Sequence, residues 1–179
     1  IGTYVFNNCY SLASITIPNG VTSIVEGTFY NCYSLASITI PNGVTSIEFS
    51  AFESCCSLAS IKIPNSVTSI GAQIFYKCYS LASITIPNGI TSIGNNAFRN
   101  CYSLASITIP NGVTSIGTYV FNNCYGVAFY DFTDYTSVPT LAGTNAFTNI
   151  AADCQIRVPA SLVDAWKAAT NWSTYADHI

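Results

Sequence analysis

The stretch SLASITIPNGITSIGNNAFRNCY, residues Ser80–Tyr102, decides the fold because close copies of it fill most of the chain. Its opening letters, SLASI, begin at residues 11, 34, 57, 80 and 103, so the repeat has a strict period of 23 residues. A single unit of this kind cannot bury its own apolar residues, whereas stacked copies bury them against one another. The repeat therefore predicts a solenoid in which each unit forms one turn.

Each unit divides into short extended segments. Ile84 and Ile86 alternate with small polar residues, as in a strand with one buried face. Pro87–Gly89 then predicts a type I turn, with Pro at its second position and Gly at its fourth. Ser66 replaces this Gly in another unit, so we expect no positive φ there. Ile90–Ile93 predicts a second short strand, and the rest of the unit a short helical or irregular arm.

When the units stack, each inward position forms a ladder of like residues along the solenoid. Neighbouring strands of a sheet lie about 4.8 Å apart, so we expect the aromatic ring of one unit to stack on that of the next. The Phe ladder comprises Phe6, Phe29, Phe52, Phe75, Phe98 and Phe121, and the Leu ladder comprises Leu12, Leu35, Leu58, Leu81 and Leu104.

The repeat also sets the predicted domain organisation. We expect a solenoid over residues 1–137, made of a half unit in 1–10, five full units in 11–125 and a degenerate unit in 126–137. We expect residues 138–179 to form a C-terminal capping segment, because an open solenoid end exposes core residues and strand edges.

Within the capping segment, Cys154–Pro159 predicts a strand and Ser161–Thr170 predicts a helix with one apolar face. Ser161 and Asp164 stand at the spacing of a weak capping box at the start of that helix. Phe147 follows the last ladder Phe by 26 residues, which indicates an insertion of about three residues.

Composition excludes several classes of protein. Half of the residues are hydrophobic and only 7% are charged, against about 25% charged in ordinary domains. No apolar run approaches the ~18 residues of a spanning helix, so we expect no direct membrane insertion. The net charge of −3, with five basic residues, argues against nucleic-acid binding. Ile1–Tyr10 repeats Ile116–Tyr125, so we interpret the chain as trimmed within a repeat, with any signal sequence upstream.

The cysteines form another ladder: Cys9, Cys32, Cys55, Cys78, Cys101 and Cys124, with Cys56 and Cys154 outside it. Eight cysteines in a secreted chain could form four disulfides. Stacked residues, however, hold parallel Cβ atoms nearly 5 Å apart, and a disulfide favours about 3.8 Å. We therefore predict reduced thiols that pack as small apolar groups, with disulfides as the alternative. The lack of a CxxC pair and the single histidine, His178, argue against a metal site.

The sequence contains no set of residues typical of a catalytic site. Only His178, in the capping segment, could activate one of the many serines. The acidic residues recur at no ladder position, although a pair of carboxylates could still meet in the C-terminal part. We predict a protein that is not an enzyme and uses no cofactor.

Two surfaces are candidates for binding. The first is the outward face of the first strand of each unit, with Ser14, Thr16, Ser37, Thr39, Ser60, Lys62, Ser83, Thr85, Ser106 and Thr108. The competing interpretation is that these are solvated positions chosen for β-propensity. The second is the arm, where the units differ most, for example at Tyr30, Glu53, Tyr76, Arg99 and Asn122.

A row of tyrosines precedes the first strands. It comprises Tyr10, Tyr33, Tyr79, Tyr102 and Tyr125, and Cys56 interrupts it. Tyrosine suits interfaces, yet we expect these rings to pack half-buried between turns.

The run Cys32–Phe52 follows the pattern Cys-x-Ser-Leu-x-Ser-Ile-x-Ile-Pro-x-x-Val-x-x-Ile-x-x-x-x-Phe. It resembles the treponemal-type leucine-rich repeat of BspA-like surface proteins, and the resemblance covers Ile1–Tyr125. The tail VPASLVDAWKAATNW, from Val158, resembles the C-terminal segment of similar proteins of gut and oral bacteria. The resemblance implies a leucine-rich-repeat solenoid, mainly β with short helical or irregular arms and an α-helical C-terminal cap. It implies no catalytic residues.

The resemblance also implies a function. We expect a non-catalytic module, extracellular or on the surface of a bacterium, that binds a host or bacterial surface protein and serves in adhesion. We expect it to act as a monomer. One alternative is a structural spacer within a larger surface protein. Another is carbohydrate or surface binding through the Ser/Thr rows, which a flat array would favour and a strongly curved one would disfavour.

Overall fold

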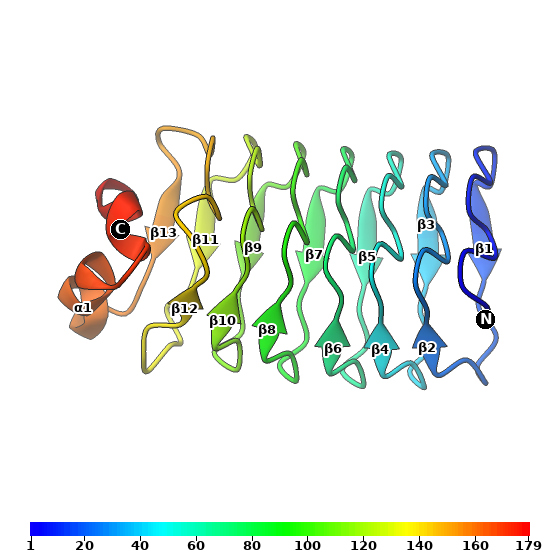
Figure 1. Ribbon diagram of the computed structural model, residues 1–179, viewed down its shortest axis with the longest axis horizontal. Helices are drawn as coiled ribbons and strands as arrows, with labels where there is room; N and C mark the ends of the chain where they lie inside the picture. Colours follow the sequence, from blue (N-terminus) through cyan, green and yellow to red (C-terminus); the bar gives the residue numbers. More distant parts are fainter.

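The computed structural model describes residues 1–179 as one elongated solenoid (Figure 1). Successive turns follow one another along the long axis, from the N-terminus at one end to a small group of helices at the other. The leucine-rich-repeat solenoid predicted from the sequence is thus confirmed, as is its mainly β character with a helical C-terminal cap.

Each repeat contributes two strands. The odd-numbered strands are β1 (Ser14–Thr16), β3 (Ser37–Thr39), β5 (Ser60–Lys62), β7 (Ser83–Thr85), β9 (Ser106–Thr108), β11 (Phe129–Asp131) and β13 (Gln155–Arg157). The even-numbered strands are β2 (Ser23–Ile24), β4 (Ser46–Ile47), β6 (Ser69–Ile70), β8 (Ser92–Ile93), β10 (Ser115–Ile116) and β12 (Thr140–Leu141). Odd strands pair with odd and even with even, always in parallel.

The strand register follows the repeat. Ile15 of β1 lies opposite Ile38 of β3, so each isoleucine meets its own copy one turn away. The hydrogen-bonded ladder is interrupted between β6 and β8 and between β7 and β9, which divides each set of strands in two. Strands β12 and β13 still pair with β10 and β11, so the stacking of turns extends into the segment expected to cap the solenoid.

The Pro-Asn-Gly turns differ from the prediction by one position. The amide of Ile90 donates a hydrogen bond of 3.2 Å to the carbonyl of Pro87, which makes Pro the first residue of the turn and Gly the third. The predicted second position for Pro was therefore wrong. The expectation that this Gly needs no positive φ is confirmed, because the only glycine with positive φ is Gly27, in an arm.

The arms are irregular and contain residues with a left-handed backbone, that is, with positive φ. Each complete arm has two of them, four residues apart, such as Asn96 and Asn100 with φ of 57° and 63°. Left-handed backbone is uncommon for residues other than Gly and is several-fold enriched in Asn. The second of these positions is Asn in most turns, and Asn123 donates a hydrogen bond from its side chain to that of Asn100 at 2.8 Å. The arms therefore stack through side chains as well as through backbone.

The core consists of the predicted ladders. Adjacent rings from Phe6 to Phe121 stack with centroids 5.4–5.7 Å apart, and Phe147 continues the stack at 5.2 Å from Phe121. The Leu ladder from Leu35 to Leu104 is fully buried beside it. The Phe stack predicted from the 23-residue period is confirmed, including the three-residue insertion before Phe147.

The C-terminal end is closed by helix α1 (Val163–Ala168) and two 3-10 helices, Ala160–Leu162 and Trp172–His178. Trp166 and Trp172 are fully buried against Phe132 of the last turns. The indole of Trp172 donates a hydrogen bond of 2.7 Å to the carbonyl of Pro139. The predicted capping box is wrong, because Leu162 occupies the N-cap and no side chain bonds to the helix start.

Candidate binding face

The outward residues of the odd strands form two polar rows, which we call the strand face. Nine of the ten residues predicted for it are exposed, and Ser106 is half-buried. They are Ser14, Ser37, Ser60, Ser83 and Ser106 in one row, and Thr16, Thr39, Lys62, Thr85 and Thr108 in the other. Pairing of the odd strands sets these residues beside their copies in the next turn, in full between β1 and β3 and between β5 and β7, and at Thr39 and Lys62 between β3 and β5. Strands β7 and β9 are not paired.

The strand face continues into strands that the sequence reasoning did not assign to it. Phe129 and Gln155 extend the Ser row, while Asp131 and Arg157 extend the Thr row. The guanidinium carbon of Arg157 lies 3.8 Å from the centre of the Phe129 ring, a cation–π contact. The register Ser106–Phe129 still has the 23-residue spacing, and that spacing was the available signal for Phe129.

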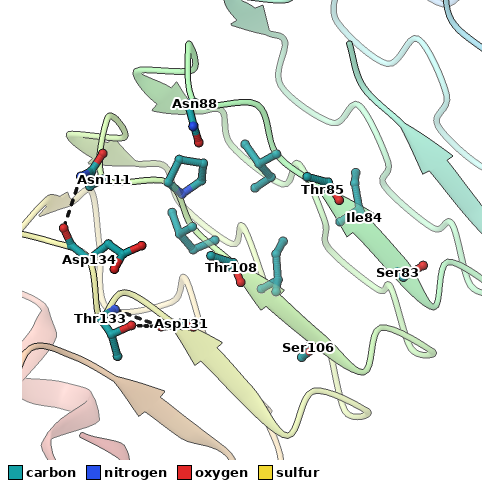
Figure 2. Close-up of a pocket in the computed structure, with 14 residues that line it drawn as sticks. Ser83, Ile84, Thr85, Asn88, Ser106, Thr108, Asn111, Asp131, Thr133 and Asp134 are labelled. Carbon is teal, nitrogen blue, oxygen red and sulfur yellow. Dashed lines mark hydrogen bonds between the residues drawn. The ribbon is translucent and has the colours of Figure 1, made fainter. Parts of the chain in front are cut away.

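A hollow of about 430 Å³ opens on the strand face where pairing between β7 and β9 is interrupted (Figure 2). Hydroxyl side chains of the Ser and Thr rows line this hollow, and half-buried Ile84 lies among them. A second hollow of about 300 Å³ lies between β5 and β7. The strand face is therefore hollowed between turns and offers apolar surface between its hydroxyl rows.

The larger hollow is polar at the end where the strands finish. Asn88, Asn111 and Asp134 line this end, and Figure 2 shows them together. The side chain of Asp131 accepts hydrogen bonds from the amide and hydroxyl of Thr133, at 3.0 and 2.7 Å, which fixes the carboxylate. Amides, hydroxyls and two carboxylates can together accept and donate several hydrogen bonds to a bound partner.

The tyrosine row borders the strand face where the odd strands begin. Its rings form one stacked pair, Tyr10 and Tyr33, and one stacked triple, Tyr79, Tyr102 and Tyr125. The ring centroids are 5.0 Å apart in the pair and 5.0 and 5.6 Å apart in the triple. The expectation of half-buried packing holds for Tyr79 alone. Tyr10, Tyr33, Tyr102 and Tyr125 are 41–53% exposed, because the stacked rings cover each other's faces and leave their edges in solvent. We call this row the tyrosine edge.

The cysteine ladder belongs to the core and contributes nothing to the surface site. All eight thiols are free, and five ladder thiols donate hydrogen bonds of 3.1–3.3 Å to the carbonyl of the Phe 26 residues earlier. Burial raises the pKa of the Cys32 thiol to about 11 and that of Cys124 to about 12. The inward position predicted for the ladder is confirmed from Cys32 to Cys124, whereas Cys9 in the first turn is half-buried.

The histidine, cysteine and acidic side chains do not gather into a metal site. No group of three or more His, Cys, Asp or Glu side chains is arranged to hold a metal ion. The only histidine, His178, has Nδ1 2.9 Å from the carbonyl oxygen of Cys154, within the C-terminal cap. No helix combines the length and apolar character needed to cross a membrane.

The comparison with protein families identifies the repeat. The pattern of the BspA type leucine-rich repeat region matches residues 1–128 in six copies. The chain belongs to this family. The resemblance seen in the sequence is thus confirmed, and membership of this leucine-rich-repeat family supports a protein-binding repeat module.

Solved structures agree on the fold. A leucine-rich repeat protein of T. pallidum is 36% identical over 73% of this chain, with a TM-score of 0.71, and this chain covers 61% of that structure. A leucine-rich repeat protein of Bacteroides ovatus is 23% identical, with a TM-score of 0.64, over 89% of this chain and 52% of the other. A leucine-rich cell surface protein of Faecalibacterium prausnitzii is 23% identical, with a TM-score of 0.53, over 97% and 65%. No curated protein matches the chain.

Proposed function

We propose that this BspA-type solenoid is a non-catalytic module of a bacterial cell-surface protein, and that it binds a host or bacterial surface protein in adhesion. The contact is made by the strand face together with the tyrosine edge. A surface location is supported by the F. prausnitzii structure, which is that of a leucine-rich cell surface protein. The family's repeat supports a protein partner.

The observation that carries this proposal is the composition of the exposed face. Tyr, Ser, Thr and Asn dominate it, with stacked rings such as Tyr102 and Tyr125 along one side. Antibody paratopes use a similar set, because Tyr gives rigid contact area at low entropic cost and Ser and Asn give adaptable hydrogen bonds. The hollow with Asp131 and Asp134 adds a place where a basic side chain of the partner can insert.

The repeat gives the face equivalent contacts in every turn. Ser60 and Ser83, for example, are register partners with the same exposure. Several weak contacts made at once raise the overall affinity without any single strong pocket. This suits attachment to a partner that itself repeats.

The straightness of the solenoid favours a second candidate function. In Figure 1 the turns succeed one another along a nearly straight line rather than a tight horseshoe. Straight rows of hydroxyls spaced at the strand repeat fit a carbohydrate or another ordered surface, so the Ser/Thr rows are then the contact.

The test uses two matched variants. Thr85→Lys with Thr108→Lys alters the strand face, and Lys62 occupies the same row, so the fold accommodates lysine there. Thr68→Lys with Thr91→Lys places the same charges beside the even strands, also on exposed threonines. Binding of each variant and of the original chain is measured by surface plasmon resonance on immobilised matrix proteins and on glycans.

A protein-binding strand face predicts binding to a matrix or bacterial surface protein that the strand-face variant loses and the even-strand variant keeps. Selective binding to glycans with the same loss supports the second candidate. Binding that both variants keep contradicts the strand face as the site. A chain that binds nothing in either panel contradicts the adhesion proposal and agrees with a structural spacer.

A further inference from the structure

Four side chains from three successive turns gather on the arms. The guanidinium carbon of Arg99 lies 5.1 Å from the ring centre of Tyr119 and 5.7 Å from that of Tyr76. The ammonium nitrogen of Lys77 lies 4.9 Å from the same Tyr76 ring. Cations at these distances are attracted to the negative face of the ring, so both are held against tyrosine. We call Tyr76, Lys77, Arg99 and Tyr119 the arm patch.

The register of the repeat explains how the arm patch assembles. Tyr76 and Arg99 occupy the same position in successive units, with Asn122 next, so their side chains are neighbours along the solenoid. Tyr119 stands at the position that Asn96 holds one turn earlier. These positions differ from unit to unit, and the core ladders do not require any particular residue at them.

Arg99 is fixed in place but keeps free donors. Its Nε donates to the side-chain oxygen of Asn122 at 3.1 Å, and one Nη1 hydrogen donates to that of Asn96 at 3.3 Å. A guanidinium has five N–H donors, so three are left for another acceptor. Arg99 and Lys77 are half-buried rather than covered, and Tyr119 is 38% exposed. Planar donors held in this way suit a carboxylate or a sulfate.

The arm patch is basic within an acidic chain. It holds two of the five basic residues of a protein whose net charge is −3. The carboxyl group that acts on Lys77 is that of Glu53, which is buried and accepts a hydrogen bond of 2.6 Å from Ser50. Burial raises the pKa of Glu53, while Ser50 and Lys77 lower it. Arg99 donates to amide oxygens alone, so its charge has no carboxylate partner.

We propose that the arm patch binds the acid group of an acidic saccharide. Lys77 and the free N–H groups of Arg99 hold the carboxylate or sulfate, and the exposed ring of Tyr119 packs against the sugar. The five best-formed hollows of the protein are lined by other residues, so the arm patch is an open surface site rather than part of one of them. This site is separate from the strand face and does not depend on the function proposed for that face.

The test is isothermal titration calorimetry of the whole chain with three probes. Tetragalacturonate carries sugar carboxylates, its methyl ester removes their charge, and hexaglutamate carries carboxylates on a peptide. The arm patch predicts binding of tetragalacturonate, with the ester weaker by about tenfold or more because a charge-assisted hydrogen bond is lost. Failure of tetragalacturonate to bind at millimolar concentration, or tighter binding of hexaglutamate, overturns the proposal.

Two variants locate the site. Arg99→Gln removes the charge, and Asn122 at the same position of the next turn shows that an amide fits there. Lys167→Gln is the control, because it also removes one positive charge and Lys167 is exposed on helix α1 in the C-terminal cap, outside both proposed sites. We expect Arg99→Gln to weaken tetragalacturonate binding about tenfold and Lys167→Gln to leave it within about twofold, with both variants unfolding at an unchanged temperature. Equal losses in the two variants overturn the proposal.

Discussion

The thiol of Cys78 donates a hydrogen bond of 3.2 Å to the carbonyl oxygen of Phe52, one turn earlier in the solenoid. The same link recurs at Cys32, Cys55, Cys101 and Cys124, so it joins successive turns beside the Phe stack. A thiol can make this bond only while it keeps its proton. The ladder cysteines therefore stabilise the stack as protonated donors.

Removal of one such donor tests this role. We expect Cys78→Ala to lower the free energy of unfolding by about 1–2 kcal/mol, because it opens a small cavity and removes the thiol hydrogen bond to the Phe52 carbonyl. That carbonyl keeps its bond of 3.1 Å from the amide of Cys55. Cys56→Ala is the control, since Cys56 is half-buried and lies outside the ladder, and we expect a change within about 0.5 kcal/mol. Urea unfolding measures both. Equal losses would show that the ladder bond contributes nothing specific.

Alkaline pH should destabilise the solenoid through the same thiols. Burial raises the pKa of Cys32 to about 11 and of Cys124 to about 12, whereas unfolded thiols ionise near their ordinary value of about 8.5–9. Above that value the unfolded chain binds fewer protons than the folded chain, so stability falls as pH rises. The stability contributed by the protonated thiols is complete below about pH 8 and is lost between about pH 9 and 12.

Buried tyrosines such as Tyr130 add a loss of the same sign at higher pH, because burial raises the pKa of Tyr130 as well. A comparison with Cys32→Ala separates the thiol contribution, because Cys32 is not among the groups that shift the pKa of Tyr130. Urea midpoints measured from pH 7 to 10.5 should fall less steeply for this variant than for the original chain. Parallel curves would contradict the contribution assigned to the Cys32 thiol.

Loss of a ring from the Phe stack should lower the free energy of unfolding by more than loss of a ladder thiol. The ring of Phe98 lies 5.6 Å from that of Phe75 and 5.5 Å from that of Phe121, and it is fully buried. We expect Phe98→Ala to cost about 3–5 kcal/mol in unfolding free energy. Phe49→Ala, at a residue 42% exposed, should change it by no more than about 0.5 kcal/mol. A loss below about 1.5 kcal/mol for Phe98→Ala would rule out the ladder as the main source of stability.

At the left-handed arm positions we expect Gly to be a more stable replacement than Ala, which is the reverse of the usual order. Asn100 has φ of 63° and accepts a hydrogen bond from Asn123. Both Asn100→Ala and Asn100→Gly lose this bond, but only Ala carries a Cβ that strains left-handed backbone, by about 1–2 kcal/mol. Thermal unfolding should therefore show Asn100→Gly to be the more stable variant. If Ala proves the better residue, the arm backbone described here is wrong.

The sequence predicted the stack well because a strict period leaves one solution for residues such as Phe75 and Leu81. Each must meet its own copy in the next turn, whatever the exact path of the chain between. The odd and even strands followed from the same reasoning. The outward position of Ser83 and Thr85 needed only the alternation of a strand.

Features that depend on the backbone between the ladders escaped prediction. Pro87 lies one place earlier in its turn than assigned, because several turn types accept Pro. The tyrosine edge is more exposed than expected, since spacing alone does not say how far Tyr102 projects. The hollow beside β9 depends on a break in strand pairing that no residue of the repeat signals. Asn100 and Asn123 were a readable signal for left-handed arms, and the expectation of helical or irregular arms did not use it.

Threonine methyl groups test most directly whether the strand face is the binding surface. Each of several turns carries an exposed Thr on an odd strand and another beside an even strand, and the two sets are Thr16, Thr39, Thr85 and Thr108 against Thr22, Thr45, Thr91 and Thr114. Methyl NMR spectra are recorded as a partner protein from the binding panel is added. The strand face predicts shifts in the first set while the second stays within experimental error. Shifts confined to the second set would contradict it.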